Sequence, residues 1–247
     1  MTREVRVIGL PGMPELEAGD DLAALVVEAA ARAAGLEDGD VVVVAQKAVS
    51  KVEGRVVDLR EIEPSERARV LAGEADPRRV EVILHEAREI IRSRPPLLIT
   101  ETEHGFVCAS AGVDSSNAKG PDTLILLPLD PDASAARLRD AIHELTGIVV
   151  GVIVSDSFGR AWRQGTADVA LGVAGVEALR DLRGKRDSVG YELHATQIAI
   201  ADEIAGAAEL VMGKTDGVPA AVVRGARVAG SGLGTDLLMP RERDLFR

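Results

Sequence analysis

The sequence predicts a mixed α+β protein, built as one domain over residues 1–247 in which two subdomains intertwine without a clear boundary. Three observations lead to this prediction. Short apolar runs typical of buried strands alternate with segments of helical periodicity. These elements follow one another in an irregular order, which argues against a plain doubly wound βαβ sheet. No internal repeat or low-complexity linker divides the chain.

The N-terminal elements follow from their apolar spacing. Residues 5–10 read as a strand, and residues 22–33 have apolar side chains at helical intervals. Asp20 and Asp21 are the N-cap candidates for this helix, since their carboxylates can accept from the first free amides. Residues 41–45, Val-Val-Val-Val-Ala, are a short apolar run suited to a strand buried on both faces.

A second helix has the clearest start. Asp76 can cap it, Pro77 suits its first position, and its apolar face continues to Ile91 before Pro95-Pro96 ends it. Further strands are predicted at residues 97–100, 107–111, 123–127, 148–154, 169–176 and 218–223, and further helices at 138–145 and 195–212. The charged tail after Thr235 is expected to be loosely held.

Composition excludes several classes of protein. The chain has 29 Lys and Arg against 40 Asp and Glu, a net charge of −11, whereas a general nucleic-acid binder or membrane-surface protein needs the opposite sign. Its one cysteine, Cys108, excludes an intrachain disulfide framework and is expected in the core. The sequence has neither an apolar signal core nor a membrane span, so we expect a cytoplasmic protein.

Polar, glycine-bearing segments follow several predicted strands, where mixed folds usually build their sites. Residues 10–16 form a proline-stiffened loop, for which a rigid connector is the favoured alternative. Residues 46–51 hold two of the five lysines, Lys47 and Lys51. A lysine is a compact charge that suits phosphate, and a solvated edge is an equal alternative.

Two later segments carry oxygen ligands. Residues 112–117 combine a carboxylate, two hydroxyls and an amide, which suit a hard cation and a nucleotide. The alternative is an Asx turn, which is common for this composition. Residues 154–165 place Asp156 between two serines and follow it with two arginines and the only tryptophan. Asp156 can hold a metal, and Arg160 and Arg163 can hold a carboxylate or phosphate. A functional interpretation of this segment is favoured over a structural one.

Residues 212–218, Met-Gly-Lys-Thr-Asp-Gly-Val, resemble part of a Walker A loop but do not match it. The position of the first glycine is Ala208, and a predicted helix, not a strand, precedes the loop. We interpret it as a helix C-cap loop whose backbone amides can cradle phosphates. A Ser/His/Asp hydrolase is disfavoured because no histidine is paired with a nucleophile.

Taken together, seven ordered segments resemble the GTP-dependent coenzyme F420:L-glutamate ligase family, also called the F420-0:γ-glutamyl ligases. They are LPGMPELEAGDDLAAL, LEDGDVVVVAQKAVSKVEGRVVDL, HGFVCASAGVDSSN, LLPLDPDASA, GVIVSDSFGRAWRQG, LRGKRDSVGYEL and ADEIAGAAELVMGKTDGVPAAVVRG. The likeness covers nearly the whole chain. It resembles the stand-alone form, not members fused to a flavin-binding reductase-like domain. It implies an α+β fold of interleaved subdomains that forms a homodimer.

The resemblance also implies a reaction. A carboxylate of the deazaflavin coenzyme precursor F420-0 is joined to the amine of L-glutamate, with further γ-linked glutamates as an extension, while GTP is converted to GDP and phosphate. An acyl phosphate is expected, since amide formation in water is uphill. Mg²⁺ or Mn²⁺ is expected because phosphoryl transfer to a carboxylate brings like charges together. The family is also described with K⁺. The alternatives are a catalytically silent nucleotide-binding regulatory module of this fold and a ligase for another acceptor acid.

Residue by residue, the resemblance places the nucleotide against Met13, Pro14, Glu15, Leu16, Gln46, Lys51, Asn117, Met212, Gly213, Lys214, Thr215, Asp216, Gly217 and Val218. It places divalent cations on Asp114, Asp156 and Ser157. In the family an acidic ligand stands two residues after the methionine of the last loop, where this chain has Lys214. Asp216 is the substitute candidate, or the second cation is held by fewer groups. Arg160 and Arg163 remain the candidate catalytic residues.

Overall fold

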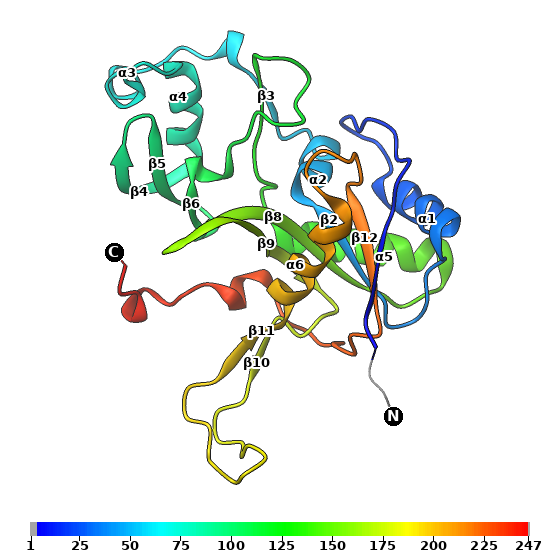
Figure 1. Ribbon diagram of the computed structural model, residues 1–247. Helices are drawn as coiled ribbons and strands as arrows, with labels where there is room; N and C mark the ends of the chain where they lie inside the picture. Colours follow the sequence, from blue (N-terminus) through cyan, green and yellow to red (C-terminus); the bar gives the residue numbers. More distant parts are fainter. Residues whose placement is uncertain (1–3, 247) are drawn as a thin grey trace.

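A five-stranded mixed sheet forms the centre of the protein, for which a computed structural model describes residues 4–246 (Figure 1). In spatial order its strands are β1 (Arg6–Gly9), β12 (Ala220–Arg224), β2 (Val41–Ala45), β8 (Gly151–Arg160) and β9 (Arg163–Ala174). β2 and β8 run parallel, and the other neighbours run antiparallel. This mixture of helices and strands confirms the predicted α+β class. No helix in the described part of the chain is long and apolar enough to cross a membrane.

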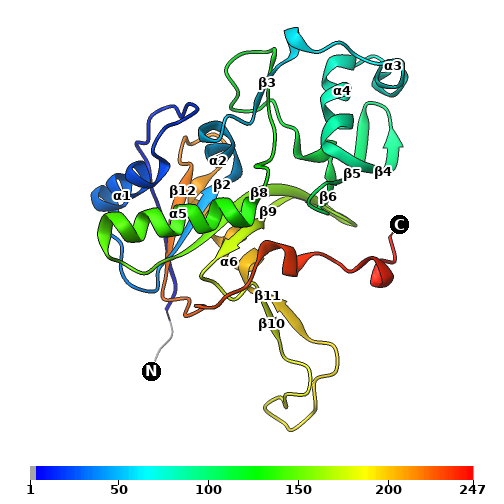
Figure 2. The same cartoon turned by 180° about the vertical axis from the view of Figure 1, so that it is seen from behind.

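Helices cover both faces of this sheet. α1 (Leu22–Ala33) and α5 (Pro131–Thr146) lie on one face, as Figure 2 shows, and α6 (Ile200–Met212) lies on the other. Val42 and Val44 of β2 pack in the core with α1 and α5, whereas Val41 and Val43 pack with α6. A strand buried on both faces needs apolar side chains at every position, which explains the run of valines.

The predicted helix boundaries are confirmed where a cap residue marks them. Asp21 caps α1 by accepting from the backbone N of Ala24 at 3.0 Å. Asp76 accepts from the backbone N of Arg78 at the start of α4 (Pro77–Glu86), with Pro77 in the first turn. Gly147 ends α5 in the left-handed conformation, with φ at 73°, where a glycine carries no Cβ penalty.

A second, smaller lobe has its own core. β4 (Ala87–Arg94), β5 (Leu97–Thr102) and β6 (Val107–Ala109) form an antiparallel sheet, accompanied by α3 (Glu66–Ala72) and α4. Ile83 of α4, Leu98 of β5 and Leu124 are fully buried in this core. The short pair β3 (Val56–Asp58) and β7 (Thr123–Ile125) also belongs to this half of the molecule. Cys108 is buried on β6, as expected.

The prediction of one helix continuing to Ile91 is wrong. α4 ends at Glu86, and residues 87–94 form β4, which pairs with β5 across the turn at Pro95-Pro96. The apolar residues Ile90 and Ile91 fit either period, so pairing with β5 decides their conformation. The predicted strands at 107–111 and 123–127 are also shorter in the structure. β6 ends at Ala109, where residues 110–112 form a 3₁₀ turn, and β7 ends at Ile125.

The helix predicted at 195–212 begins five residues later in the structure, at Ile200. Residues 197–199 form β11 (Gln197–Ala199), which pairs with β10 (Leu179–Asp181), and α6 begins only at Ile200. The chain between these two strands projects from the body as an arm (Figure 1). The charged tail is also more ordered than expected. It contains 3₁₀ turns at 234–237 and 241–243, and Leu238 packs against a small core cluster.

Candidate nucleotide and metal site

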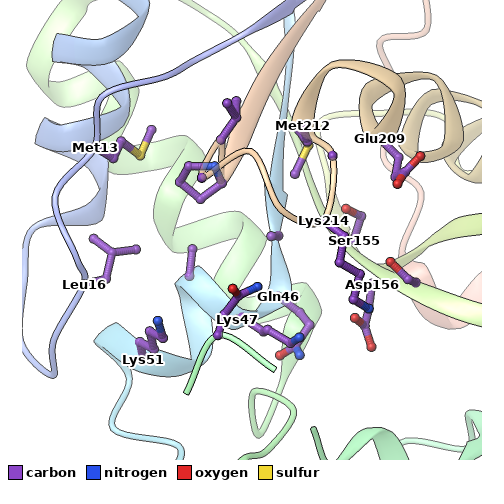
Figure 3. A pocket seen from close by; sticks show the side chains of 18 of the residues that line it. Met13, Leu16, Gln46, Lys47, Lys51, Ser155, Asp156, Glu209, Met212 and Lys214 are labelled. Atoms are coloured by element: carbon purple, nitrogen blue, oxygen red, sulfur yellow. The ribbon is translucent and has the colours of Figure 1, made fainter. Parts of the chain in front are cut away.

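A cavity of about 270 Å³ opens where the β1–α1 loop, the start of α2 (Gln46–Val52), β8, β9 and the loop after α6 come together (Figure 3). Most of the side chains predicted to bind a nucleotide or metal line this cavity: Met13, Pro14, Glu15, Leu16, Gln46, Lys51, Asn117, Asp156, Ser157, Met212, Gly213, Lys214, Gly217 and Val218. Segments from distant parts of the sequence therefore meet at one place.

The other predicted residues lie elsewhere. Asp114 does not line the cavity but forms a salt bridge with Lys47, which does. Thr215 and Asp216 belong to the α6 loop but do not line the cavity. Arg160 and Arg163 are exposed at the end of the β8–β9 hairpin and do not line it either. The structure therefore does not bring the two candidate catalytic arginines to this cavity.

Two predicted strand-end loops are in fact regular structure. Residues 46–52 form α2 directly after β2, and β8 continues through Ser157 to Arg160 instead of stopping at Val154. Helical spacing places Lys47 and Lys51 one turn apart on α2, so both face the cavity. Pairing with β9 holds the end of β8 in the strand conformation, with Ser157 opposite Asp168.

Each lysine of α2 has a carboxylate partner. The Nζ of Lys51 lies 2.5 Å from Oε1 of Glu15, in the β1–α1 loop. The Nζ of Lys47 lies 2.6 Å from Oδ2 of Asp114 and also donates to the hydroxyl of Ser116. Both lysines line the cavity, Lys51 together with its partner Glu15, whereas Asp114, the partner of Lys47, lies outside the lining.

The pKa of Asp114 is set by two opposing effects. Burial raises it, but hydrogen bonds from the Lys47 ammonium and the Ser116 amide outweigh burial and hold the pKa at about 2. Asp114 is therefore ionised at neutral pH. It forms a charge-assisted pair with Lys47, whose side chain is only 12% exposed.

Asp156 has the opposite behaviour. Burial, reinforced by the negative charges of Asp168 and Asp114, raises its pKa to about 7, although the Ser157 amide and Lys47 act to lower it. Asp168 lies on β9, where it accepts from the hydroxyls of Ser155 at 2.9 Å and Ser157 at 2.7 Å. The charged form of Asp156 is therefore disfavoured by its burial and by the two neighbouring carboxylates.

The predicted nucleotide and metal residues leave out several side chains that line the cavity, among them Asp168 and Glu209. Lys47, predicted from the sequence only as a candidate for phosphate, lines it as well. Asp168 is recognisable only once the β8–β9 register is known, because that pairing sets it opposite Ser157. Glu209 lies on α6 three residues before Met212, a spacing that puts both side chains on one helix face.

Gln46 has a free hydrogen-bond donor at the cavity. Its side chain is 1% exposed, and its Oε1 accepts from the Ser50 hydroxyl at 2.8 Å. Within residues 4–246, its Nε2 is the buried side-chain nitrogen or oxygen atom left without a partner. A buried donor without an acceptor is costly, so this amide is suited to a ligand oxygen in the cavity that Gln46 lines.

The donor set of the charged wall is the one that hard divalent cations prefer. It consists of carboxylate oxygens from Asp156 and Asp168 and hydroxyl oxygens from Ser155 and Ser157. In the described residues, no three His, Cys, Asp or Glu side chains form a cluster that could hold a metal ion. A cation here would therefore complete its ligands with hydroxyl, water or phosphate oxygens, as Mg²⁺ commonly does.

The loop after α6 presents Lys214 to the cavity, whereas Asp216 folds back toward Gly213. Gly213 has φ at 57°, and a Cβ there would meet Oδ2 of Asp216 at 2.3 Å. A side chain at position 213 would thus displace this turn. The position where the family resemblance expects an acidic ligand carries a cation that faces the cavity.

The fold and cavity define an α+β protein with a cavity lined by lysines, carboxyl groups and hydroxyls. The sequence model of the family described as F420-0:Gamma-glutamyl ligase matches residues 12–225. The Coenzyme F420:L-glutamate ligase of Methanocaldococcus jannaschii is 46% identical over 99% of this chain and 98% of that protein. Its namesake from Methanopyrus kandleri is 47% identical over 98% of each chain. The chain belongs to the F420-0:gamma-glutamyl ligase family.

Proposed function

We propose that this protein joins L-glutamate to the carboxylate of coenzyme F420-0 with GTP as the energy source and Mg²⁺ or Mn²⁺ as the metal. One observation carries the proposal: a single cavity collects lysines, carboxylates and hydroxyls from five separate segments of the chain. The choice of acceptor and amino acid is supported by the relatives named coenzyme F420:L-glutamate ligase, which are similar over nearly the whole chain.

The two sides of the cavity differ in character, which gives the nucleotide a direction. Met13 and Leu16 lie on one side and Asp156 and Glu209 on the other, with Lys47 between them (Figure 3). The base suits the apolar side, because a purine buries a large flat surface. The phosphates then extend toward Lys47, Lys214 and the carboxyl groups, where the acceptor acid must also approach.

The chemistry requires a carboxylate and a phosphate to meet. An acceptor carboxylate oxygen attacks the terminal phosphorus of GTP, the bond to the bridging oxygen breaks, and GDP leaves. The amine of glutamate then attacks the acyl carbon and loses a proton to solvent, the bond from that carbon to the phosphate oxygen breaks, and phosphate leaves with the former carboxylate oxygen. Lys47 and Lys214 offset the negative charge of the phosphates. A divalent cation held by Asp156, Ser157 and Asp114 would supply further charge neutralisation and orientation.

The direct test is incubation of the purified protein with F420-0, L-glutamate, GTP and MgCl₂ or MnCl₂, followed by mass spectrometry. We expect acceptor mass to rise by one glutamyl residue or more, and GTP to be consumed only when both acceptor and glutamate are present. Parallel reactions in KCl and NaCl test the proposed K⁺ requirement. GTP consumption without acceptor, or no product at any metal, would contradict the proposal.

Lys51→Ala should weaken nucleotide binding more than glutamate binding. Lys51 lines the cavity beside Glu15, so its loss leaves an unpaired carboxylate in the site for a polyanionic nucleotide. Charge-assisted contacts contribute about 1.5–3 kcal/mol. We therefore expect the variant to bind a non-hydrolysable GTP analogue at least about tenfold more weakly than the unmodified protein. Calorimetry measures this. Lys185→Ala, on the arm between β10 and β11, removes the same charge from a side chain that does not line the cavity and serves as control. Equal affinities for all three proteins would remove Lys51 from the site.

The homodimer remains part of the proposal and has a separate basis. Trp162 is 89% exposed at the end of the β8–β9 hairpin, and Val189 and Tyr191 are exposed on the projecting arm. Large apolar side chains on projecting segments are typical of interaction surfaces. Light scattering coupled to gel filtration should give twice the mass of one chain, and a monomer at working concentration would contradict this.

A further inference from the structure

Lys47 stands at the meeting point of the two predicted metal-binding aspartates. Its Nζ is 2.6 Å from Oδ2 of Asp114, and its charge acts on Asp156 from close enough to oppose the rise in that group's pKa. Its side chain lines the cavity and is only 12% exposed. The ammonium is therefore a cation already present among carboxyl groups that suit a divalent ion.

An ammonium and a divalent cation compete for this position. The Lys47 ammonium uses a lone pair of Asp114 Oδ2 and donates to the hydroxyl of Ser116. A metal bound by Asp114 needs oxygen lone pairs of the same carboxylate. In addition, two positive centres at bonding distance from one carboxylate repel each other strongly in a partly buried site. The metal can bind Asp114 well only if Lys47 moves.

The cavity that Lys47 lines offers its ammonium group a second position. A lysine carries its charge on a flexible four-carbon stem, and this one lines an open cavity next to the buried, unpartnered Nε2 of Gln46. A triphosphate in the cavity would offer the ammonium several strong acceptors. The nucleotide can thus draw Lys47 off Asp114 and leave that carboxylate to the metal.

We propose that Lys47 is an exchangeable cation that holds Asp114 in the empty protein and passes to the nucleotide phosphates when these bind, so that divalent metal and nucleotide bind cooperatively. The identity of the nucleotide and metal rests on the proposed function; the exchange does not. Because coupling between two ligands is reciprocal, the metal also strengthens nucleotide binding, and couplings of this kind typically reach about 5- to 150-fold.

The test is a Mn²⁺ titration without nucleotide, with free Mn²⁺ read by electron paramagnetic resonance. Removing the competitor should free Asp114, so Lys47→Met and Lys47→Gln should bind Mn²⁺ about tenfold more tightly than the unmodified protein. Lys47→Gln keeps a donor for Asp114 and Ser116, which safeguards folding. Lys47→Arg keeps the charge and should stay weak. Folding is checked by circular dichroism and thermal unfolding.

Two controls identify the source of the gain. Lys51→Met removes one charge from the same helix, but its partner is Glu15, so Mn²⁺ affinity should change little. In the double variant Lys47→Met/Asp114→Asn the gain should disappear, because the released ligand is gone. Folded Lys47→Met and Lys47→Gln proteins that bind Mn²⁺ no more tightly than the unmodified protein would overturn the proposal.

A second measurement follows the other half of the exchange. In EDTA, a non-hydrolysable GTP analogue should bind Lys47→Met about tenfold more weakly, since the phosphates lose a cation. Unchanged affinity would also overturn the exchange. Because neither measurement uses acceptor or glutamate, its outcome is separate from that of ligation. Normal ligation with unchanged Mn²⁺ affinity rejects only the role of Lys47, and the predicted Mn²⁺ behaviour without ligation rejects only the proposed reaction.

Discussion

Asp156→Asn should abolish ligation while the protein stays folded. The side chain keeps its shape, but the buried carboxyl group on the charged wall of the cavity loses the negative charge that a divalent cation needs. Loss of a group that offsets transition-state charge lowers the rate by about a thousandfold or more. The measurement is kcat/KM from product formation. Near-normal turnover of folded Asp156→Asn would exclude a metal role for this residue.

The same substitution should make the metal-free protein more stable at neutral pH. The pKa of Asp156 is about 7 in the folded protein against an ordinary 3.8, so the folded state holds a proton that the unfolded state has released. Stability therefore falls as pH rises between about 4 and 7, by about 1.4 kcal/mol for each pKa unit, and Asn removes this loss. Urea unfolding in EDTA at pH 5 and pH 8 measures the difference. A stability difference that did not grow with pH would contradict this explanation.

Asp202→Asn is the matched control for the loss of activity. Burial also raises the pKa of Asp202, which lies on α6 and accepts from the Ala170 amide at 2.9 Å, but it does not line the cavity. An Asn oxygen can accept the same hydrogen bond. We expect Asp202→Asn to keep normal ligation, so that a loss of activity specific to position 156 is traced to the cavity and not to a buried charge.

Gly172→Ala should cause the largest loss of stability. Gly172 lies on β9 against the start of α5, and a Cβ there would come within 2.0 Å of the carbonyl oxygen of Pro131. Neither backbone can yield without moving α5 from the sheet. We expect the free energy of unfolding to fall by about 3 kcal/mol and Tm to fall by about 6–12 °C.

Gly159→Ala provides the comparison within the same hairpin. A Cβ at Gly159 meets nothing within 4 Å, and its backbone is not in the left-handed region. Its Tm should change by no more than a degree or two. Calorimetry of both variants separates close packing from the general effect of adding a methyl group. Equal Tm values for Gly172→Ala and Gly159→Ala would show that β9 and α5 are not packed as described.

Sequence reasoning predicted the elements whose signals are local. The valine run of β2 and the caps Asp21 and Asp76 identify strands and helix starts from a few neighbouring residues. It failed where pairing with a distant segment decides the conformation. β4 and β11 contain residues that also fit a helix, and only their partners β5 and β10 hold them extended.

At the candidate site, too, local sequence patterns were predictive and contacts between distant segments were not. The family resemblance gathered the cavity residues of the β1–α1 loop, α2 and the α6 loop, which the structure places around one space. It gave no account of Lys47 or Asp168, because their importance comes from contacts with Asp114 and with Ser155 and Ser157. These contacts depend on the register of β8 and β9 and on the position of α2 after β2, neither of which is written in local sequence.

The central claim is that the cavity brings the terminal phosphate of GTP to an acceptor carboxylate. Acceptor labelled with heavy oxygen in that carboxylate tests it most directly, in a ligation reaction followed by mass analysis of the released phosphate. Attack by the carboxylate carries one labelled oxygen into phosphate for every amide formed. We predict labelled phosphate in proportion to product. Product formed with unlabelled phosphate would show that the carboxylate is never phosphorylated and would contradict the account.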